Sequence, residues 1–472
     1  MNLRKYGLLI NGQEIVKTYF LPVQQKYTGN LLAEVSVAEK DDVDRAVDAS
    51  MEGQNLVLPP YQRYQILHSA ASLLRERKED LAHLMTDEVG KPIIEARTEV
   101  ERAAMTLEIS AEEAKRIQGQ GIPVEASPGA EERRAFTIKV PVGVVAAITP
   151  FNVPLNLACH KIGPALAAGN SVIVKPAEKT PLSTIYLANL LLEAGLPHQR
   201  LHVLTGHGPD IGRWLTDNPN VHMFTFTGSP RVGEQLRKQA GLRKVALELG
   251  NNSATIVHKD ADIREAAKLV SMRSFNSAGQ VCISVQRVFV HADVYNEFLE
   301  QVVDHTKQLH VGDPHLEDTQ VGPMISESEA QRVEAWVNEA VADGAKLETG
   351  GLREGAIYHP TILTNVTETM KVCKDEVFGP VVTMDTYEDA DDVFERVNRS
   401  QYGLQAGVFS MNMRFCLGAA EKLNVGGVII NDTSAFRVDA MPYGGVKKSG
   451  TGKEGPRYAM EDMMTERLVV LR

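Results

Sequence analysis

Apolar residues follow a helical period in the first third of the chain. Between residues 41 and 118 they recur at i, i+3, i+4 and i+7, and Leu67, Ala70, Ala71 and Leu74 fall on one face. After a short β start, this pattern predicts helices over 41–51, 61–89 and 95–118. Residues 122–140 alternate weakly around a Ser-Pro-Gly turn, which predicts a polar hairpin.

From Val142 onward, short apolar runs alternate with helical stretches. The runs predict strands over 142–149, 171–174, 202–204, 223–226, 245–247, 253–257 and 287–291, and the stretches predict helices over 182–195, 231–241, 263–277 and 294–310. This alternation is typical of parallel, doubly wound sheets, so the fold class is α/β with two such domains in series. The apolar tail 464–471 predicts a last strand that pairs with the 122–140 hairpin, within the chain or across a subunit boundary.

Composition and charge narrow the class of protein. The 472 residues are 43% hydrophobic and 24% charged, which is typical of a globular protein with a sizeable core. With 50 basic and 61 acidic residues the net charge is −11, which argues against nucleic-acid and membrane partners. The four cysteines form no C-x-x-C pair, so neither a metal site nor a disulfide framework is expected. The first residues do not resemble a signal peptide, and a cytoplasmic location is expected.

Two glycine-rich turns are candidate phosphate-binding sites. Gly206–Gly212 and Gly228–Gly233 each follow a predicted strand and open a helix, where backbone N–H groups can hold an anion. Neither matches a standard fingerprint, because the first is one residue too long and Glu234 replaces the lysine of a P-loop in the second. Two ordinary strand–helix turns explain the same glycines.

Cys282 and Glu248 are a candidate nucleophile and base. A thiol with a carboxylate nearby is a sensible pair for covalent catalysis. Glu248 ends an apolar strand and precedes Gly250, an unusual place for a structural glutamate. A lone cysteine is also commonly a small buried apolar residue, so these two residues alone leave both interpretations open.

Seven motifs in one order resemble the NAD(P)-dependent aldehyde dehydrogenase superfamily along nearly the whole chain. They are Thr149–Pro154, Lys175–Glu178, Phe226–Ser229, Leu247–Gly250, Gly279–Cys282, Glu376–Pro380 and Pro442–Gly450. Phe151 and the end of the last motif resemble the branch of lactaldehyde and other short hydroxyaldehyde dehydrogenases. The resemblance implies a Rossmann-like NAD-binding domain (1–121 and 142–248), a catalytic domain (249–441) and a small β oligomerisation segment (122–141 and 458–472).

The resemblance also implies residue roles. Cys282 would attack the aldehyde, Asn152 would bind the oxyanion, and Glu248 would activate the water that hydrolyses the thioester. Lys161 and Glu454 match positions that relay the proton from Glu248, although a structural ion pair explains them equally. The positions implied for the cofactor are Thr149, Pro150, Phe151, Lys175, Ala177, Glu178, Gly208, Phe226, Gly228, Ser229, Val232, Leu249, Gly250, Glu376 and Phe378. NAD is expected over NADP, because a 2′-phosphate would meet the Glu178 carboxylate.

The expected substrate is a small, polar aldehyde. Phe151, Val281 and Ile283, which flank the implied pocket, are modest in size. Arg437 precedes the last motif and either holds a carboxylate or sulfonate of the substrate, or pairs with Asp432 or Asp439 and stiffens its loop. The first possibility predicts succinate semialdehyde or sulfolactaldehyde, and the second predicts lactaldehyde or glycolaldehyde.

Two other functions fit parts of the pattern. A CoA-acylating semialdehyde dehydrogenase resembles this chain in Pro150-Phe151-Asn152 but lacks the general-base glutamate, so Glu248 favours hydrolysis. A non-catalytic protein on the same scaffold would not need to keep Cys282.

The hairpin and tail strands have edges that need partners, so a homodimer or homotetramer is expected.

Overall fold

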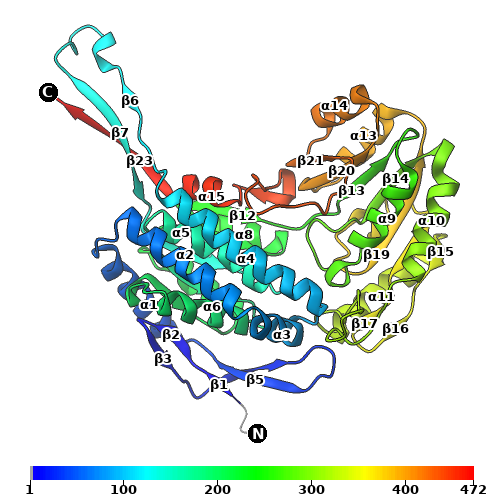
Figure 1. Cartoon of the computed structure of the whole chain (residues 1–472), viewed down its shortest axis with the longest axis horizontal. Coiled ribbons are helices and arrows are strands. Elements are labelled where there is room, and N and C mark those ends of the chain that lie inside the picture. The colour runs from blue at the N-terminus through cyan, green and yellow to red at the C-terminus, as the bar shows by residue number, and fades with distance from the viewer. Residues whose placement is uncertain (1–3) are drawn as a thin grey trace.

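The computed structural model describes residues 4–472 and contains two large α/β units side by side (Figure 1). The first is built on an eight-stranded sheet of order β22-β12-β11-β8-β9-β10-β2-β3. Its five central strands are parallel, and β2, β3 and β22 add to its ends in antiparallel orientation. The strands are β2 (Leu8–Ile10), β3 (Gln13–Ile15), β8 (Val144–Ile148), β9 (Ser171–Lys175), β10 (Leu201–Val203), β11 (Met223–Thr227), β12 (Lys244–Glu248) and β22 (Gly450–Thr451).

Helices cover both faces of this sheet because alternate strand residues point to opposite sides. Val145 and Val172 pack against one group of helices, while Val144 and Ile173 pack against another. The first group is α2 (Pro60–Glu76), α3 (Lys78–Val89), α4 (Ile93–Ala114), α5 (Pro154–Ala167) and α6 (Leu182–Glu193). The second is α1 (Lys40–Gln54), α7 (Gly208–Asp217) and α8 (Pro230–Ala240).

The second unit has a seven-stranded sheet of order β15-β18-β19-β14-β13-β20-β21, in which only β15 is antiparallel. Its strands are β13 (Ala254–Val257), β14 (Arg287–His291), β15 (Lys346–Thr349), β18 (Thr361–Thr364), β19 (Val381–Tyr387), β20 (Gln405–Phe409) and β21 (Gly427–Ile430). Apolar residues of α9 (Ile263–Arg273), α10 (Tyr295–Lys307) and α11 (Glu327–Ala342) cover one face, and those of α13 (Ala390–Asn398) and α14 (Met413–Lys422) cover the other. These two units confirm the predicted α/β class.

A three-stranded sheet extends away from the body as an arm that also carries the C-terminus (Figure 1). It consists of β6 (Gly121–Ile122), β7 (Arg134–Pro141) and β23 (Met464–Leu471), and β23 pairs along its whole length with β7. The predicted pairing of the tail with the hairpin is therefore confirmed within the chain. β1 (Lys5–Tyr6), β4 (Phe20–Gln24) and β5 (Leu31–Ser36) form a small sheet near the N-terminus.

Three helix predictions were wrong in their bounds. The helix expected over 95–118 ends at Ala114. The helix expected over 61–89 is two helices, because the backbone leaves the helical region at Arg77 (φ −103°, ψ 26°). The helix expected over 263–277 ends at Arg273, where the chain turns toward Cys282. Within residues 4–472, every helix is too short or too polar to cross a bilayer.

The chain crosses between the two units twice. Residues 249–253 lead from β12 into β13, and the segment after β21 returns to place β22 beside β12. Glu248 is the last residue of β12, so it lies where the chain first crosses. The candidate site is built around this crossing.

Candidate active site

The loop that carries Cys282 has an unusual backbone. Ser277, Ala278 and Gly279 have consecutive φ values of 48°, 54° and 70°. A side chain at Gly279 would place its Cβ 2.1 Å from the Gly379 carbonyl oxygen, so glycine is required there. Glu95 of α4 holds the loop by accepting hydrogen bonds from the Ser277 backbone N–H and hydroxyl. Left-handed conformations in non-glycine residues are costly and persist only where contacts enforce them.

Gln280 connects this loop to Asn152. The Asn152 side-chain amide donates to the Gln280 carbonyl at 2.7 Å. The Gln280 side chain in turn donates to the Ser277 carbonyl at 2.9 Å and accepts from the Ile325 backbone N–H at 2.9 Å. The structure thus brings Asn152 to the Cys282 loop.

Tyr443 is the polar neighbour of the Cys282 thiol. Its hydroxyl lies 2.9 Å from the Cys282 Sγ, and the Arg437 guanidinium stacks 3.8 Å from the centre of its ring. Burial raises the pKa of Cys282 to about 12, against the opposing effects of Tyr443 and Arg437. The thiol is therefore protonated at neutral pH in this state and needs a base to become a nucleophile.

Glu248 and Glu454 are neighbouring buried carboxyls in opposite states. Both oxygens of Glu248 are buried and lack a hydrogen-bond partner among residues 4–472. Burial, reinforced by the Glu454 charge, raises the pKa of Glu248 well above its ordinary value. Burial would also raise the pKa of Glu454, but Lys161 at 3.2 Å and Arg437 at 2.8 Å outweigh it and lower that pKa to about 2. Glu454 thus keeps its charge while Glu248 is poised to hold or release a proton.

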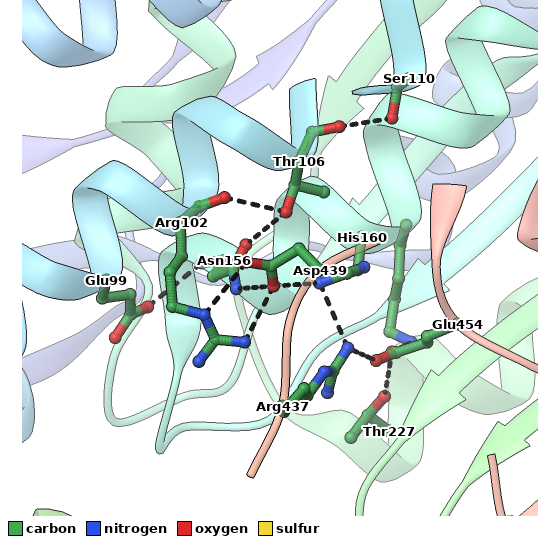
Figure 2. A network of polar contacts seen from close by, with 11 residues as sticks. Glu99, Arg102, Thr106, Ser110, Asn156, His160, Thr227, Arg437, Asp439 and Glu454 are labelled. Atoms are coloured by element: carbon green, nitrogen blue, oxygen red, sulfur yellow. Dashed lines mark hydrogen bonds and ion pairs between the residues drawn. The ribbon is translucent and has the colours of Figure 1, made fainter. Parts of the chain in front are cut away.

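A chain of polar contacts runs from Glu454 to α4 (Figure 2). Arg437 contacts Glu454 and also lies 3.2 Å from Nε2 of His160 on α5. That same nitrogen is 2.9 Å from Asp439, which accepts two hydrogen bonds from Arg102 at 2.8 and 3.1 Å. The alternative interpretation, in which Arg437 pairs with Asp432 or Asp439, is wrong, because Arg273 pairs with Asp432 and Arg102 with Asp439.

Two adjoining cavities lead to the thiol. The inner one, of about 50 Å³, is lined by Cys282, Glu248, Asn152, Tyr443 and Glu454, among others. The outer one, of about 290 Å³, is lined by charged residues that include Lys91, Arg102 and Arg273. Five residues line both cavities: Arg102, Val153, Val281, Ile283 and Arg437. Phe151 lines neither cavity and packs edge-on against Phe378, with ring centres 5.7 Å apart.

Most of the residues expected to bind the cofactor gather at the carboxyl ends of the parallel strands, where dinucleotides bind in such sheets. Thr149 follows β8 and Lys175 ends β9, and the Thr149 hydroxyl is buried without a partner in the described chain. Glu178 accepts from the Gly208 N–H at 2.7 Å and lies 3.8 Å from the Lys175 ammonium. Burial lowers the pKa of Lys175. Pro150 and Ala177 lie beside these residues in the same two loops.

The other expected cofactor residues also come together. Gly228 and Ser229 precede α8, whose first turn carries the exposed Val232, and a Cβ at Gly228 would come within 2.5 Å of Phe226. Glu376 accepts from the Asn251 N–H at 2.9 Å, and burial raises the pKa of Glu376 to about 7. A Cβ at Gly250 would meet Glu376 at 2.3 Å, while Leu249 is buried beneath α8. A buried hydroxyl without a partner in the described chain, glycines with no room for a side chain, and carboxylates that can accept from ribose fit a dinucleotide.

Sequence reasoning missed several site residues. Tyr443 stands inside the last motif but received no role. Arg102, His160 and Glu95 lie on α4 and α5 at ordinary helical positions and carried no signal. In the part of the chain that the structure describes, no group of three or more His, Cys, Asp or Glu residues is arranged to hold a metal ion.

The fold and the comparisons with known proteins define an NAD(P)-dependent oxidoreductase that oxidises small polar aldehydes to carboxylates. The model described as "Aldehyde dehydrogenase family" matches residues 14–469, and the chain belongs to this family. The chain is 60% identical over 469 residues to a 3-sulfolactaldehyde dehydrogenase of Priestia megaterium, covering 99% of this chain and 98% of that one.

Two further relatives show the range of the family. A lactaldehyde dehydrogenase of Methanocaldococcus jannaschii is 40% identical over 457 residues, which cover 96% of this chain and 97% of that one. The crystal structure of aldehyde dehydrogenase 21 from Physcomitrella patens, in complex with the reaction product succinate, matches with a TM-score of 0.97 and 38% identity. That match covers 100% of this chain and 99% of the other. The resemblance to the aldehyde dehydrogenases, including the branch with lactaldehyde dehydrogenases, is confirmed.

Proposed function

We propose that this chain oxidises 3-sulfolactaldehyde, a three-carbon hydroxyaldehyde with a terminal sulfonate, to the corresponding carboxylate. The observation that carries the proposal is the place of Arg437, a buried cation that lines both the cavity of the thiol and the outer cavity. The 60% identity to a 3-sulfolactaldehyde dehydrogenase favours the sulfonate over other anionic groups.

Arg437 has donors left for a substrate anion. Only one of its nitrogens, Nη2, bonds to Glu454 and contacts His160, whereas its Nε is buried without a partner within residues 4–472. An arginine presents five N–H donors in a planar fork, which suits a sulfonate. Arg102 lines the same two cavities and brings a second positive charge, partly offset by Asp439.

The chemistry begins at Cys282. Its sulfur attacks the aldehyde carbon, and the proton of the thiol passes to a base. The oxyanion that forms accepts hydrogen bonds from the Asn152 amide and the Cys282 N–H, and one such donor is typically worth about 3–4 kcal/mol of barrier. For this the Asn152 amide must turn from the Gln280 carbonyl, to which it donates in this state.

Bound NAD+ supplies the acceptor for the hydride that leaves the thiohemiacetal carbon, and a thioester on Cys282 remains. Glu248 then takes a proton from the water that attacks the thioester, which frees the carboxylate product and the thiol. Lys161 and Glu454 are assigned to the relay of that proton, with Glu454 as a transient carrier, because Lys161 and Arg437 hold its pKa at about 2 and return it to the charged state. The Glu454 charge also adds to the raised pKa of Glu248.

The cofactor would lie along the strand ends of the first unit. Lys175 and Glu178 would hold the adenosine ribose, Gly228 and Ser229 the pyrophosphate, and Glu376 the nicotinamide ribose beside Phe378. The remaining contacts would come from Thr149, Pro150, Phe151, Ala177, Gly208, Phe226, Val232, Leu249 and Gly250. NAD is preferred to NADP because the part-exposed Glu178 carboxylate would repel a 2′-phosphate.

The domain roles follow the same scheme. Residues 1–121 and 142–248 bind NAD, residues 249–441 carry the nucleophile, and residues 122–141 and 458–472 hold subunits together. β23 leaves one edge open and exposes Leu468, Val470 and Leu471, which favours a homodimer or homotetramer. Transfer to CoA is disfavoured because Glu248 provides the base that hydrolysis needs.

The experiment compares 3-sulfolactaldehyde with lactaldehyde, which has the same carbon skeleton without the sulfonate. In Arg437→Ala, kcat/KM for 3-sulfolactaldehyde should fall about 10–100-fold more than for lactaldehyde, the effect of one charged hydrogen bond. Arg437→Lys should recover part of this ratio. Arg273→Gln is the matched control, an arginine of the outer cavity that is paired with Asp432. An equal loss with both aldehydes in Arg437→Ala would refute the assignment.

A further inference from the structure

A third cavity, of about 190 Å³, lies in the second unit and shares no lining residue with the two cavities at Cys282. β14 and β19 form one wall, and the opposite walls come from the segments 366–368, 373–374 and 396–401. The aldehyde and cofactor chemistry described above does not use this cavity.

Arg287, the first residue of β14, is buried in its wall. Only 8% of the residue is exposed, and its Nε donates to the Asn252 carbonyl at 3.1 Å. No carboxylate of residues 4–472 lies within ion-pair distance of its guanidinium. Burial lowers the pKa of Arg287 to about 10. A buried cation without a counter-charge destabilises the folded protein, so an anion bound beside the Arg287 guanidinium would be stabilising.

The other charges of the cavity do not neutralise Arg287. Asp385 is already paired with Arg396, and Glu368 is paired with both Arg396 and Arg399. Lys374 adds a further cation at the rim. The lining therefore carries four basic and two acidic side chains, an excess of two positive charges.

We propose that this cavity binds a small dianionic oxyanion, either inorganic phosphate or the phosphate end of a monoester, on Arg287 and Lys374. The guanidinium fork offers paired donors to two oxygens, and the ammonium of Lys374 supplies the second charge. The cavity, of about 190 Å³, is large enough for such an oxyanion, because its volume is several times the roughly 30 Å³ that one water molecule takes in the liquid.

An anion here would act on the cofactor site. Asn252, whose carbonyl binds Arg287, also donates through its side-chain amide to the carbonyls of Cys373 at 2.9 Å and Lys374 at 3.2 Å. Glu376, two residues after Lys374, accepts a hydrogen bond from the Asn251 backbone N–H. The bound oxyanion would thus order the segment that holds Glu376, and the KM for NAD should fall while the KM for the aldehyde stays constant.

The test is calorimetric titration of the purified enzyme with inorganic phosphate, with sulfate and with glycerol phosphate, at constant ionic strength in a phosphate-free buffer. Saturable one-site binding is expected, and tighter binding of glycerol phosphate than of phosphate would identify a monoester as the preferred ligand. Because titration needs no turnover, its outcome does not depend on which aldehyde the enzyme oxidises. Absence of saturable binding by the unmodified enzyme up to ~10 mM, a Kd range typical of weak sites, would overturn the proposal.

Substitutions in the cavity lining test which residues bind the ion. Arg287→Met should weaken binding at least about 10-fold, and Arg287→Lys should weaken it less because the charge remains. Arg213→Gln, which alters an exposed arginine of α7, is the matched control and should bind like the unmodified enzyme. Lys374→Met changes an exposed side chain and keeps the test decisive if Arg287→Met does not fold. An affinity equal to that of the unmodified enzyme in both Lys374→Met and Arg287→Lys would refute the site. An unchanged KM for NAD with phosphate bound would refute its coupling to the cofactor site.

Discussion

Replacing Tyr443 by phenylalanine should slow the reactions of the Cys282 thiolate. The substitution removes one hydroxyl 2.9 Å from the sulfur and leaves the ring, with Arg437 stacked on it, in place. The pKa of Tyr443 is itself raised well above its ordinary value, chiefly by burial, so the hydroxyl stays neutral and can donate to a thiolate.

The size of the effect follows from this hydrogen bond. A hydrogen bond to a charged group contributes about 1.5–3 kcal/mol, and one pKa unit corresponds to about 1.4 kcal/mol. Losing the bond should therefore raise the pKa of Cys282 further. At any pH below that pKa, the thiolate fraction should fall about 10–100-fold.

The assay is alkylation of Cys282 by iodoacetamide between pH 7 and 9, followed by mass spectrometry of the Cys282 peptide. The other three cysteines are buried, so the labelling reports one site. Tyr458→Phe, which alters a tyrosine of α15 (Pro456–Asp462) that makes no hydrogen bond to Cys282, is the control. An unchanged or faster rate in Tyr443→Phe would mean that the thiol donates to the tyrosine, and would refute the reasoning.

Three further predictions concern the proposed chemistry. Cys282→Ala should abolish oxidation while NAD still binds, which fluorescence titration would measure; substantial turnover would exclude Cys282 as the nucleophile. Glu248→Gln should keep a burst of NADH but lower steady-state kcat by about 10²–10⁴-fold. Because Glu248 acts as a base only when ionised and its pKa is raised, wild-type kcat should increase with pH through that pKa, and Glu248→Gln should lose this dependence. Glu178→Gln should raise the ratio of kcat/KM for NADP to that for NAD about 10-fold, since a like-charge repulsion is removed; an unchanged ratio would assign cofactor choice elsewhere.

Much of the fold could be predicted because local patterns decide it. The strands β14 and β23 have the predicted bounds. β14 is a buried apolar run with polar residues at both ends, whereas β23 is mostly exposed and pairs along its length with β7. The break at Arg77 could not be predicted, because the helical apolar pattern continues through it from α2 into α3. The end of α9 at Arg273 was missed because the left-handed residues that follow are imposed by Glu95 of α4, a distant part of the sequence.

The candidate site could be predicted only where motifs mark it. Cys282, Glu248 and Asn152 stand in short motifs, and the structure brings all three to one cavity. Arg102 and Asp439 are 337 residues apart, and no local pattern connects them. The alternative in which Arg437 pairs with a nearby aspartate was wrong for the same reason. Asp432 and Asp439 are close to Arg437 in the sequence, whereas Glu454 is brought to it by the pairing of Tyr443 with Glu454.

The position of residues 450–472 has a consequence for biosynthesis. These residues supply β22 to the edge of β12, Glu454 to Lys161, and β23 to β7. Lys161 is only 1% exposed, so until Glu454 is made the chain has a buried ammonium without its carboxylate, and two sheets lack a strand. Since chains are made from the N-terminus and earlier segments begin to fold first, both sheets stay incomplete until residues 450–472 leave the ribosome. A message truncated before these residues should therefore yield protein that is degraded, rather than an enzyme with slightly reduced activity.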